Sequence, residues 1–365
     1  MMKSCDSGSL PFIGDFAKFL EGAKHFGLSK NNDSADYFEK HIVQSFLDKI
    51  GVGIEVPNYP QFRDMCEMIL SLIDGLEKLK TGYIETKIPF LKTSNGLPEV
   101  EVIKRNSQLI KEKIGKSLEV RICVTGPYTL ASFFPYRDVG TFSRLGNVVS
   151  QILEKSLFSD NNGKTILASV DEPLFGLVDD PLIDFGSEGR ENLRKSWETI
   201  FSKAKSKNVR TMMHLHSTTN PLFWDIPSLD VIDSHVYDPL IQQKNTQNLL
   251  DSKDKFLKAS VAVNDFDTLI KAKITSESHE KLTESAINEK IARTWTDIKH
   301  GTVNPVIFLE SEDTMKNRLT KVINRFGLER VLYVGPECGL KGYPTYENAI
   351  ECLRRVSNIV QGYRK

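Results

Sequence analysis

The sequence lacks the features that would link it to nucleic acid, to a membrane or to a secretory route. Its 48 Lys and Arg residues are balanced by 48 Asp and Glu residues, so no excess positive charge favours a nucleic acid or an anionic membrane. No apolar run approaches the roughly 20 residues of a membrane-spanning helix. Residues 1–16 contain no apolar block followed by a cleavage site of small residues. We therefore expect no nucleic-acid partner, no membrane and no secretory signal.

Cysteine is also scarce, and its distribution argues against a disulfide framework. The five cysteines are Cys5, Cys66, Cys123, Cys338 and Cys352. An odd number of scattered cysteines in a long chain is typical of free thiols in a reducing compartment. We expect a cytoplasmic protein in which one of these thiols is reactive or binds a metal.

A glycine-rich phosphate turn is absent from the early part of the chain, which disfavours a doubly wound open sheet. Instead, short apolar runs rich in β-branched residues alternate with longer amphipathic stretches, the pattern of βα units around parallel strands. The predicted strands are 119–127, 165–173, 208–216, 229–235, 256–265, 304–311 and 330–339, with weaker candidates at 8–12 and 51–57. Helices are predicted over 59–79 and 312–328, the second of them ending at Gly327.

Polar residues gather just after the C-terminal ends of these predicted strands, where the βα loops of a barrel form the active face. We therefore predict one α/β domain over residues 1–365, a (β/α)8 TIM barrel. The polar stretch 266–303 is interpreted as a helical excursion within it.

Histidines and a cysteine at three strand ends predict a metal site. His214 and His216 alternate along one strand, so both side chains can reach the same ion. His235 ends the next predicted strand, and Cys338 lies near the end of the last one. Zinc in proteins is commonly bound by imidazole and thiolate ligands, and we predict these four residues as its ligands. The alternatives are hydrogen-bonded histidines and a buried cysteine, or Asp233 or Asp238 in place of His235.

Two adjacent carboxylates, Asp171 and Glu172, end another predicted strand. Neighbouring residues on a strand point to opposite faces, so only one of them can face the site. We choose Asp171, which could bind an ammonium group or act as a base, although an acid here could also cap a helix. The segment "TGP" at 125–127 opens a helix whose amides could bind a carboxylate, or it could be a plain βα turn.

Taken in order, these motifs resemble the C-terminal catalytic domain of cobalamin-independent methionine synthase. The matching segments are "GSLP" at 8–11, "TGP" at 125–127, "DEP" at 171–173, "HLH" at 214–216, "DVIDSH" at 230–235 and "GPECGL" at 335–340. The resemblance runs from about residue 7 to the C-terminus, without the extra N-terminal barrel of the long family members. The segment "GPYTLASFF" is similar to uroporphyrinogen decarboxylase, a barrel of the same superfamily.

The resemblance implies zinc at His214 and Cys338, while two of the family's ligands are replaced. The family's second cysteine ligand corresponds to His216, and its glutamate ligand falls near His235. The centre would therefore hold three histidines and one thiolate, and would carry less negative charge than the family's centre. The resemblance also implies that Ser9 binds the substrate carboxylate and that Asp171 faces the substrate amino group. A second acid of that pocket falls on Gln61. On this basis Asp171 and His235 are the expected catalytic residues.

The implied function is a zinc-dependent methyltransferase that methylates a thiol, homocysteine above all, to give methionine. The donor would be methyltetrahydrofolate or a methylcobamide. The chain contains no corrinoid-binding motif, so a corrinoid would come free or on a partner protein.

Three alternatives to a methyltransferase stay open. A uroporphyrinogen-type decarboxylase is disfavoured because residues 1–19 contain no arginine. A metal-dependent hydrolase is disfavoured because the His-x-His pair lies past mid-chain. The third is a catalytically diverged relative.

Overall fold

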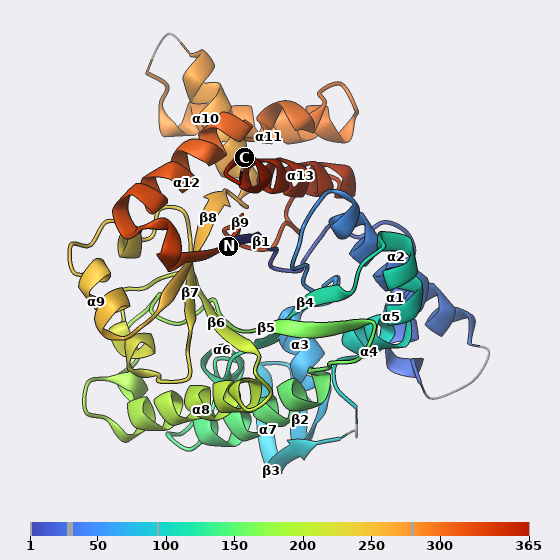
Figure 1. Cartoon of the computed structure of the whole chain (residues 1–365), viewed down its shortest axis with the longest axis vertical. Helices are drawn as coiled ribbons and strands as arrows, with labels where there is room; N and C mark the ends of the chain where they lie inside the picture. The colour runs from blue at the N-terminus through green and yellow to red at the C-terminus, as the bar shows by residue number, and fades with distance from the viewer. Residues whose placement is uncertain (1, 28–31, 93–94, 279–280, 365) are drawn as a thin grey trace.

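A curled parallel sheet forms the centre of the molecule, with helices packed around its outside (Figure 1). The computed structural model describes residues 2–27, 32–92, 95–278 and 281–364. Within them, seven strands pair in the order β1-β9-β8-β7-β6-β5-β4. These strands are β1 (Lys3–Ser4), β4 (Leu118–Thr125), β5 (Gly163–Glu172), β6 (Arg210–Leu215), β7 (Val231–Ser234), β8 (Phe256–Ala262) and β9 (Val331–Pro336). Each pair of neighbours is parallel.

The helices follow the strands, as the alternating pattern of the sequence predicts. They are α1 (Phe16–His25), α2 (Asp33–Gly51), α3 (Met65–Leu70), α4 (Pro98–Arg105), α5 (Ser107–Ile114), α6 (Pro127–Ala131), α7 (Thr141–Ser156), α8 (Glu188–Lys205), α9 (Thr246–Ser252), α10 (Phe266–Glu277), α11 (Glu284–Lys299), α12 (Glu312–Phe326) and α13 (Tyr346–Gly362). The helix predicted over 312–328 is α12, which Ser311 caps and which ends at Gly327 with φ +83°. A positive φ of this kind favours glycine at a helix end.

The expected closed eight-stranded barrel is corrected to a TIM-barrel-like curled sheet of seven strands. Segment 54–58 lies between β1 and β4, and only single bridges join it to them, Cys5 to Val56 and Asn58 to Arg121. The weak strand predicted at 51–57 is therefore reduced to these bridges. Pro57 gives a physical reason, because proline has no N–H to donate to a strand ladder. The predicted strand at 8–12 is likewise reduced to one bridge, between Ser9 and Gln61.

Two further predictions of secondary structure were wrong. Segment 304–311 forms the short 3-10 helix η4 (Pro305–Phe308) instead of a strand, because Asn304 caps the Val306 amide at 3.1 Å and proline opens the turn. The predicted helix 59–79 breaks after α3. The chain then forms β2 (Ile73–Leu79), which pairs with β3 (Gly82–Leu91) as an antiparallel hairpin outside the main sheet.

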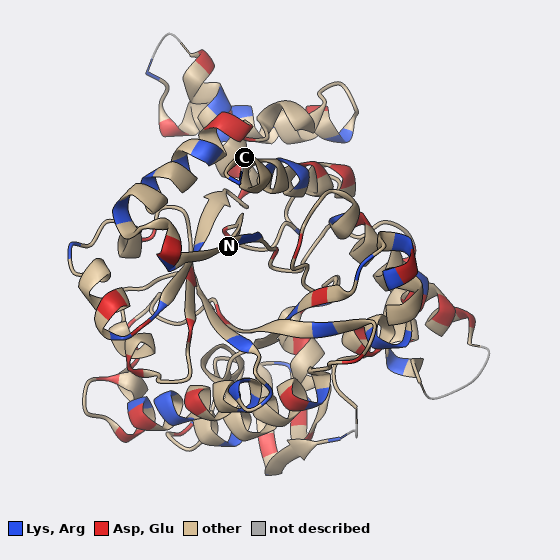
Figure 2. Cartoon of the chain, in the orientation of Figure 1, with Lys and Arg blue, Asp and Glu red and all other residues tan. Residues whose placement is uncertain are grey.

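The polar stretch 266–303 contains α10 and α11, which project from the ring beyond α13 (Figure 1). Residues 279 and 280 of this stretch lie outside the described residues. Acidic and basic side chains are interspersed over the helices that surround the sheet (Figure 2). Among the described helices, none combines the length and the apolarity needed to cross a membrane.

Candidate metal centre

Four residues predicted as metal ligands lie together at the C-terminal ends of three strands. His214 is on β6 and His216 follows it directly, His235 follows β7, and Cys338 follows β9. One ligand atom from each residue can be chosen so that all four lie within 4.8 Å of one another. The parallel strands bring these side chains together because their C-terminal ends share one edge of the sheet.

The spacing and the donor set of this cluster fit zinc. Cys338 Sγ lies 3.5 Å from His216 Nε2. Zn–N bonds of about 2.0 Å and Zn–S bonds of about 2.3 Å give a tetrahedral site an N···S separation of about 3.5 Å. Among the described residues, His214 Nε2 and His235 Nε2 are buried without a hydrogen-bond partner. Because buried polar atoms are normally paired, these two nitrogens fit the role of ligand atoms.

A buried ion pair behind His214 fixes the orientation of its ring. His214 Nδ1 lies 3.0 Å from Asp233 Oδ2, and Lys258 Nζ donates to Asp233 Oδ1 at 2.7 Å. With Nδ1 facing the carboxylate, Nε2 is left for a metal, the usual arrangement of carboxylate, histidine and zinc. Asp233, named above as an alternative ligand to His235, therefore lies behind a ligand. Asp238, the other alternative, accepts hydrogen bonds from Thr218 and from the Leu240 amide.

Lys258 is a residue of this site that the sequence prediction missed. Its side chain is buried, and it also donates to the Pro336 carbonyl at 2.7 Å. Glycine at 335 makes room for it, because a Cβ there would lie 2.9 Å from Lys258 Cε. The available signal was a lone lysine within the apolar run of β8.

The electrostatics of the cluster favour a thiolate at Cys338. Burial alone would raise the pKa of this thiol, but the three neighbouring histidines lower that pKa well below its ordinary value. Burial opposes the charged form of His214, and the Asp233 carboxylate outweighs it and raises the pKa of His214 to about 10. The pKa of Asp233 is depressed despite its burial, because Lys258 and His214 stabilise the carboxylate.

A second carboxylate, Glu337, lies behind His235. Its Oε2 is 3.8 Å from His235 Nδ1. The same carboxylate accepts hydrogen bonds from the backbone amides of Val236 and Asn264, both at 2.9 Å. Glu337 therefore ties the loops that follow β7 and β8 to the loop that carries Cys338. No prediction was made for this residue, although its place directly before Cys338 was visible in the sequence.

Asp171 and Glu172 point to opposite sides of β5, as the strand pattern predicts. Asp171 lies beside His214 in the strand register and faces inward, where Ser169 Oγ donates to it at 2.7 Å. Glu172 faces outward and accepts from the amides of Tyr128 and Thr129 and from the Trp197 indole, at 2.7 to 2.9 Å. The amides predicted to bind a carboxylate therefore bind one from this chain.

Ser9 follows β1, and Gln61 follows segment 54–58. They form a bridge with each other, and Ser9 touches Gly339, where a Cβ would lie 1.8 Å from the serine Oγ. Ser9 and Cys338 line the same narrow crevice. The structure thus places both predicted substrate-binding residues within this region, and their roles stay predictions.

Neither a family model nor a curated protein matches the chain. Among solved structures, a B12-independent methionine synthase from a Shewanella species matches with a TM-score of 0.61 and 12% identity, over 100% of this chain and 99% of that one. A candidate vitamin-B12-independent methionine synthase from Listeria monocytogenes matches with a TM-score of 0.57 and 14% identity, over 98% and 96%. A β-1,4-mannanase also matches, at a TM-score of 0.46 and 10% identity, over 98% and 99%. At these identities the likeness shows the fold alone, and one fold supports many activities.

Proposed function

We propose that the chain is a zinc-dependent methyltransferase that transfers a methyl group to a thiol. The observation that carries this proposal is the cluster of His214, His216, His235 and Cys338 at the C-terminal edge of the sheet. Zinc held by these residues would lower the pKa of a thiol that binds in place of one of the four ligands, so that a thiolate forms at neutral pH. The fold shared with methionine synthase structures and the order of the sequence motifs support the same reaction class.

The chain's own residues prepare the site for this reaction. Asp233 and Lys258 hold the His214 ring in place, and Glu337 lies behind His235. Zinc and one cysteine thiolate sum to a single positive charge, +2 − 1 = +1. Because Asp233 is already paired with Lys258, Glu337 behind His235 is the carboxylate left to compensate that charge.

The reaction itself is a displacement at carbon. The thiol releases its proton to water, and its sulfur forms a bond to the methyl carbon. The bond between that carbon and the donor breaks, and its electron pair stays on the donor. Methyltetrahydrofolate and methylcobamides both fit this description, and homocysteine is the acceptor that the sequence resemblance implies.

A cavity on the same face suggests where a donor would bind. It has a volume of about 360 Å³ and is lined by residues that follow β5 and β6. Asp179, Asp180 and Asp184 lie in its lining with Arg190, and Arg137 pairs with Asp180 at 2.9 Å, so the acids exceed the cations by one. This acidic excess disfavours a donor with a long polyanionic tail, such as a folate polyglutamate.

The test is methyl transfer by the zinc-loaded protein, with methylcobalamin and methyltetrahydrofolate supplied separately and the methylated thiol detected by mass spectrometry. We expect product from at least one donor, and none with His216→Ala or Cys338→Ala. A His300→Ala variant is the matched control, because His300 is exposed at the end of α11. Zinc bound at the cluster with no thiol methylated from either donor would contradict the proposal and favour a metal-dependent hydrolase.

A further inference from the structure

The wall of the site beside Ser9 is electrically neutral. Gln61 Nε2 donates to the Tyr59 hydroxyl at 3.0 Å and to Cys123 Sγ at 2.7 Å. Burial raises the pKa of the Cys123 thiol to about 12, and the nearby Asp171 adds to this effect. Tyr59 is also protonated, because burial raises the pKa of its hydroxyl well above the ordinary value. This wall therefore offers no carboxylate to a substrate cation.

The buried carboxylates of the interior are already matched by buried cations. The three pairs are Asp6 with Lys49 at 2.6 Å, Asp233 with Lys258 at 2.7 Å and Asp171 with Arg121 at 3.5 Å. Glu337, the remaining acid beside the cluster, accepts from two backbone amides. Among the described residues around the cluster, each inward-facing acid thus has a partner.

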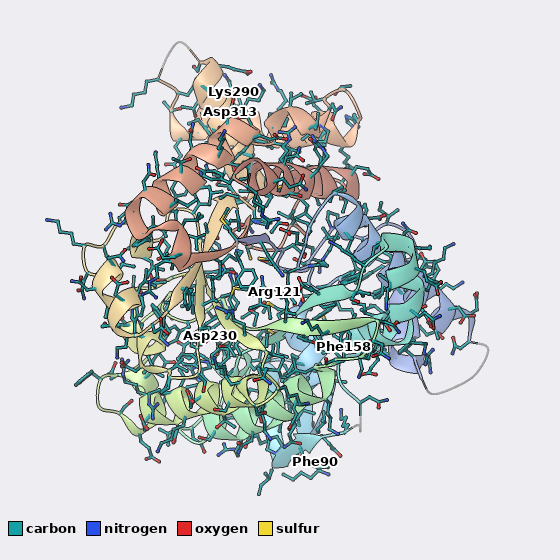
Figure 3. The ribbon with its side chains drawn as sticks, in the orientation of Figure 1. Phe90, Arg121, Phe158, Asp230, Lys290 and Asp313 are labelled. Carbon is teal, nitrogen blue, oxygen red and sulfur yellow. The ribbon has the colours of Figure 1, made fainter. Side chains whose placement is uncertain are left out.

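Asp171 is the acid that an acceptor's ammonium group would have to use, and Arg121 already depends on it. The Arg121 guanidinium is fully buried near the middle of the ring of strands (Figure 3). It donates to the Asp6 carbonyl and to Ser169 Oγ, both at 3.0 Å, and Asp171 provides its counter-charge. A second cation beside Asp171 would leave two buried positive charges for one carboxylate, which is costly in a dry interior.

We propose that the methyl acceptor is a thiol that carries no ammonium group, in place of an amino-acid thiol such as homocysteine. The inference rests on the proposed function, because it concerns the thiol that binds at the same metal centre. Its basis is the neutral wall of Gln61, Cys123 and Tyr59, together with the prior pairing of Asp171 with Arg121.

Homocysteine and 4-mercaptobutyrate form a matched pair of probes, because they differ only in the amino group. Binding is measured without turnover, as the absorbance change of the cobalt(II)-substituted protein when a thiol sulfur binds the metal. We expect 4-mercaptobutyrate to bind at least tenfold more tightly than homocysteine. Equal binding of the two thiols, or tighter binding of homocysteine, would overturn the inference while leaving the proposed function standing. If neither thiol changes the spectrum, the proposed function fails and the inference fails with it.

A substitution at position 61 tests the cause of this preference. Gln61→Glu adds the carboxylate that the wall lacks, and we expect it to reduce the preference for 4-mercaptobutyrate at least tenfold by improving homocysteine binding. Gln108→Glu is the matched control, because Gln108 is exposed on α5 and should leave both affinities unchanged. Circular dichroism checks that the Gln61→Glu protein is folded. If the folded variant keeps the same preference for 4-mercaptobutyrate over homocysteine, the assigned role of Gln61 is contradicted. The comparison of the two thiols in the unsubstituted protein tests the inference independently of this variant.

Discussion

His214 Nδ1 lies 3.0 Å from Asp233 Oδ2, and the two residues are direct neighbours in the register of β6 and β7. The contact fixes which ring nitrogen faces the cluster, because Nδ1 is held by the carboxylate and Nε2 is left free. Lys258, one strand further along the sheet, holds the other carboxylate oxygen. Three successive strands thus orient one predicted zinc ligand.

Replacing Asp233 with asparagine should weaken zinc binding by about 10 to 100-fold, the usual effect of losing a carboxylate behind a histidine ligand. The asparagine keeps the size of the side chain but removes the charge that stabilises the His214 proton. Competition with a chelator of known affinity measures the change. Asp254→Asn is the control, because Asp254 is exposed and precedes the N-terminal end of β8, whereas the cluster lies at the C-terminal ends of the strands. Equal zinc affinities of the two variants would contradict this role of Asp233.

Replacing Lys258 with methionine should destabilise the metal-free protein by about 3 to 5 kcal/mol, since it removes the nearer of the two cations that stabilise the buried Asp233 carboxylate. Guanidinium unfolding followed by circular dichroism measures the loss. Because the penalty arises from the charge of Asp233 that Lys258 no longer compensates, the double variant Lys258→Met/Asp233→Asn should recover part of the free energy of unfolding. Purely additive losses in the double variant would show that the two side chains are not coupled.

In the metal-free protein, the rate of Cys338 alkylation by iodoacetamide should fall less steeply between pH 8 and pH 6 than the rate for an ordinary thiol. The three neighbouring histidines lower the pKa of this thiol well below its ordinary value, so a larger fraction of it is thiolate at each pH. A thiol with the ordinary pKa of about 8.5 would slow by roughly tenfold for each pH unit below that value.

The other four cysteines provide an internal control for this measurement. They are buried, and burial raises the pKa of Cys5 to about 11 and those of Cys66, Cys123 and Cys352 to about 12. A Cys338→Ser protein should therefore react slowly, and zinc should protect Cys338 in the unsubstituted protein. A rate that falls tenfold per pH unit would show that the histidines do not stabilise the thiolate.

Glu172→Gln should destabilise the fold by about 1 to 3 kcal/mol without changing zinc affinity. Glu172 accepts from the amides that open α6 and from Trp197, and a glutamine keeps one acceptor oxygen while placing an NH2 group against a donor. Chemical unfolding and zinc titration separate the two effects. A large loss of zinc affinity would show that the outward-facing acid also serves the site.

The sequence allowed the cluster to be predicted because each ligand follows a strand that is easily recognised. Apolar, β-branched runs end at His214, His235 and Cys338, and parallel strands must bring such ends to one edge. Lys258 escaped prediction because its inward burial depends on the space left by Gly335, a contact between two strands that are far apart in sequence. The strand expected at 304–311 failed because local capping by Asn304 and the proline after it outweighed the apolar pattern.

The barrel was predicted in outline and not in detail for a related reason. The hydrophobic pattern of the sequence could not show that segment 54–58 forms single bridges in place of a strand. The pairing of this segment depends on Pro57 and on the positions of β1 and β4. The hairpin of β2 and β3 was hidden because the apolar residues around 65–76 also fit a helical period.

X-ray absorption spectroscopy of the zinc-loaded protein tests the central claim most directly. The account predicts about one zinc per chain, bound by three nitrogen ligands at about 2.0 Å and one sulfur at about 2.3 Å. Cys338→Ala should remove the sulfur signal. Zinc bound only by oxygen and nitrogen in the unsubstituted protein, or no bound zinc after loading, would contradict the account.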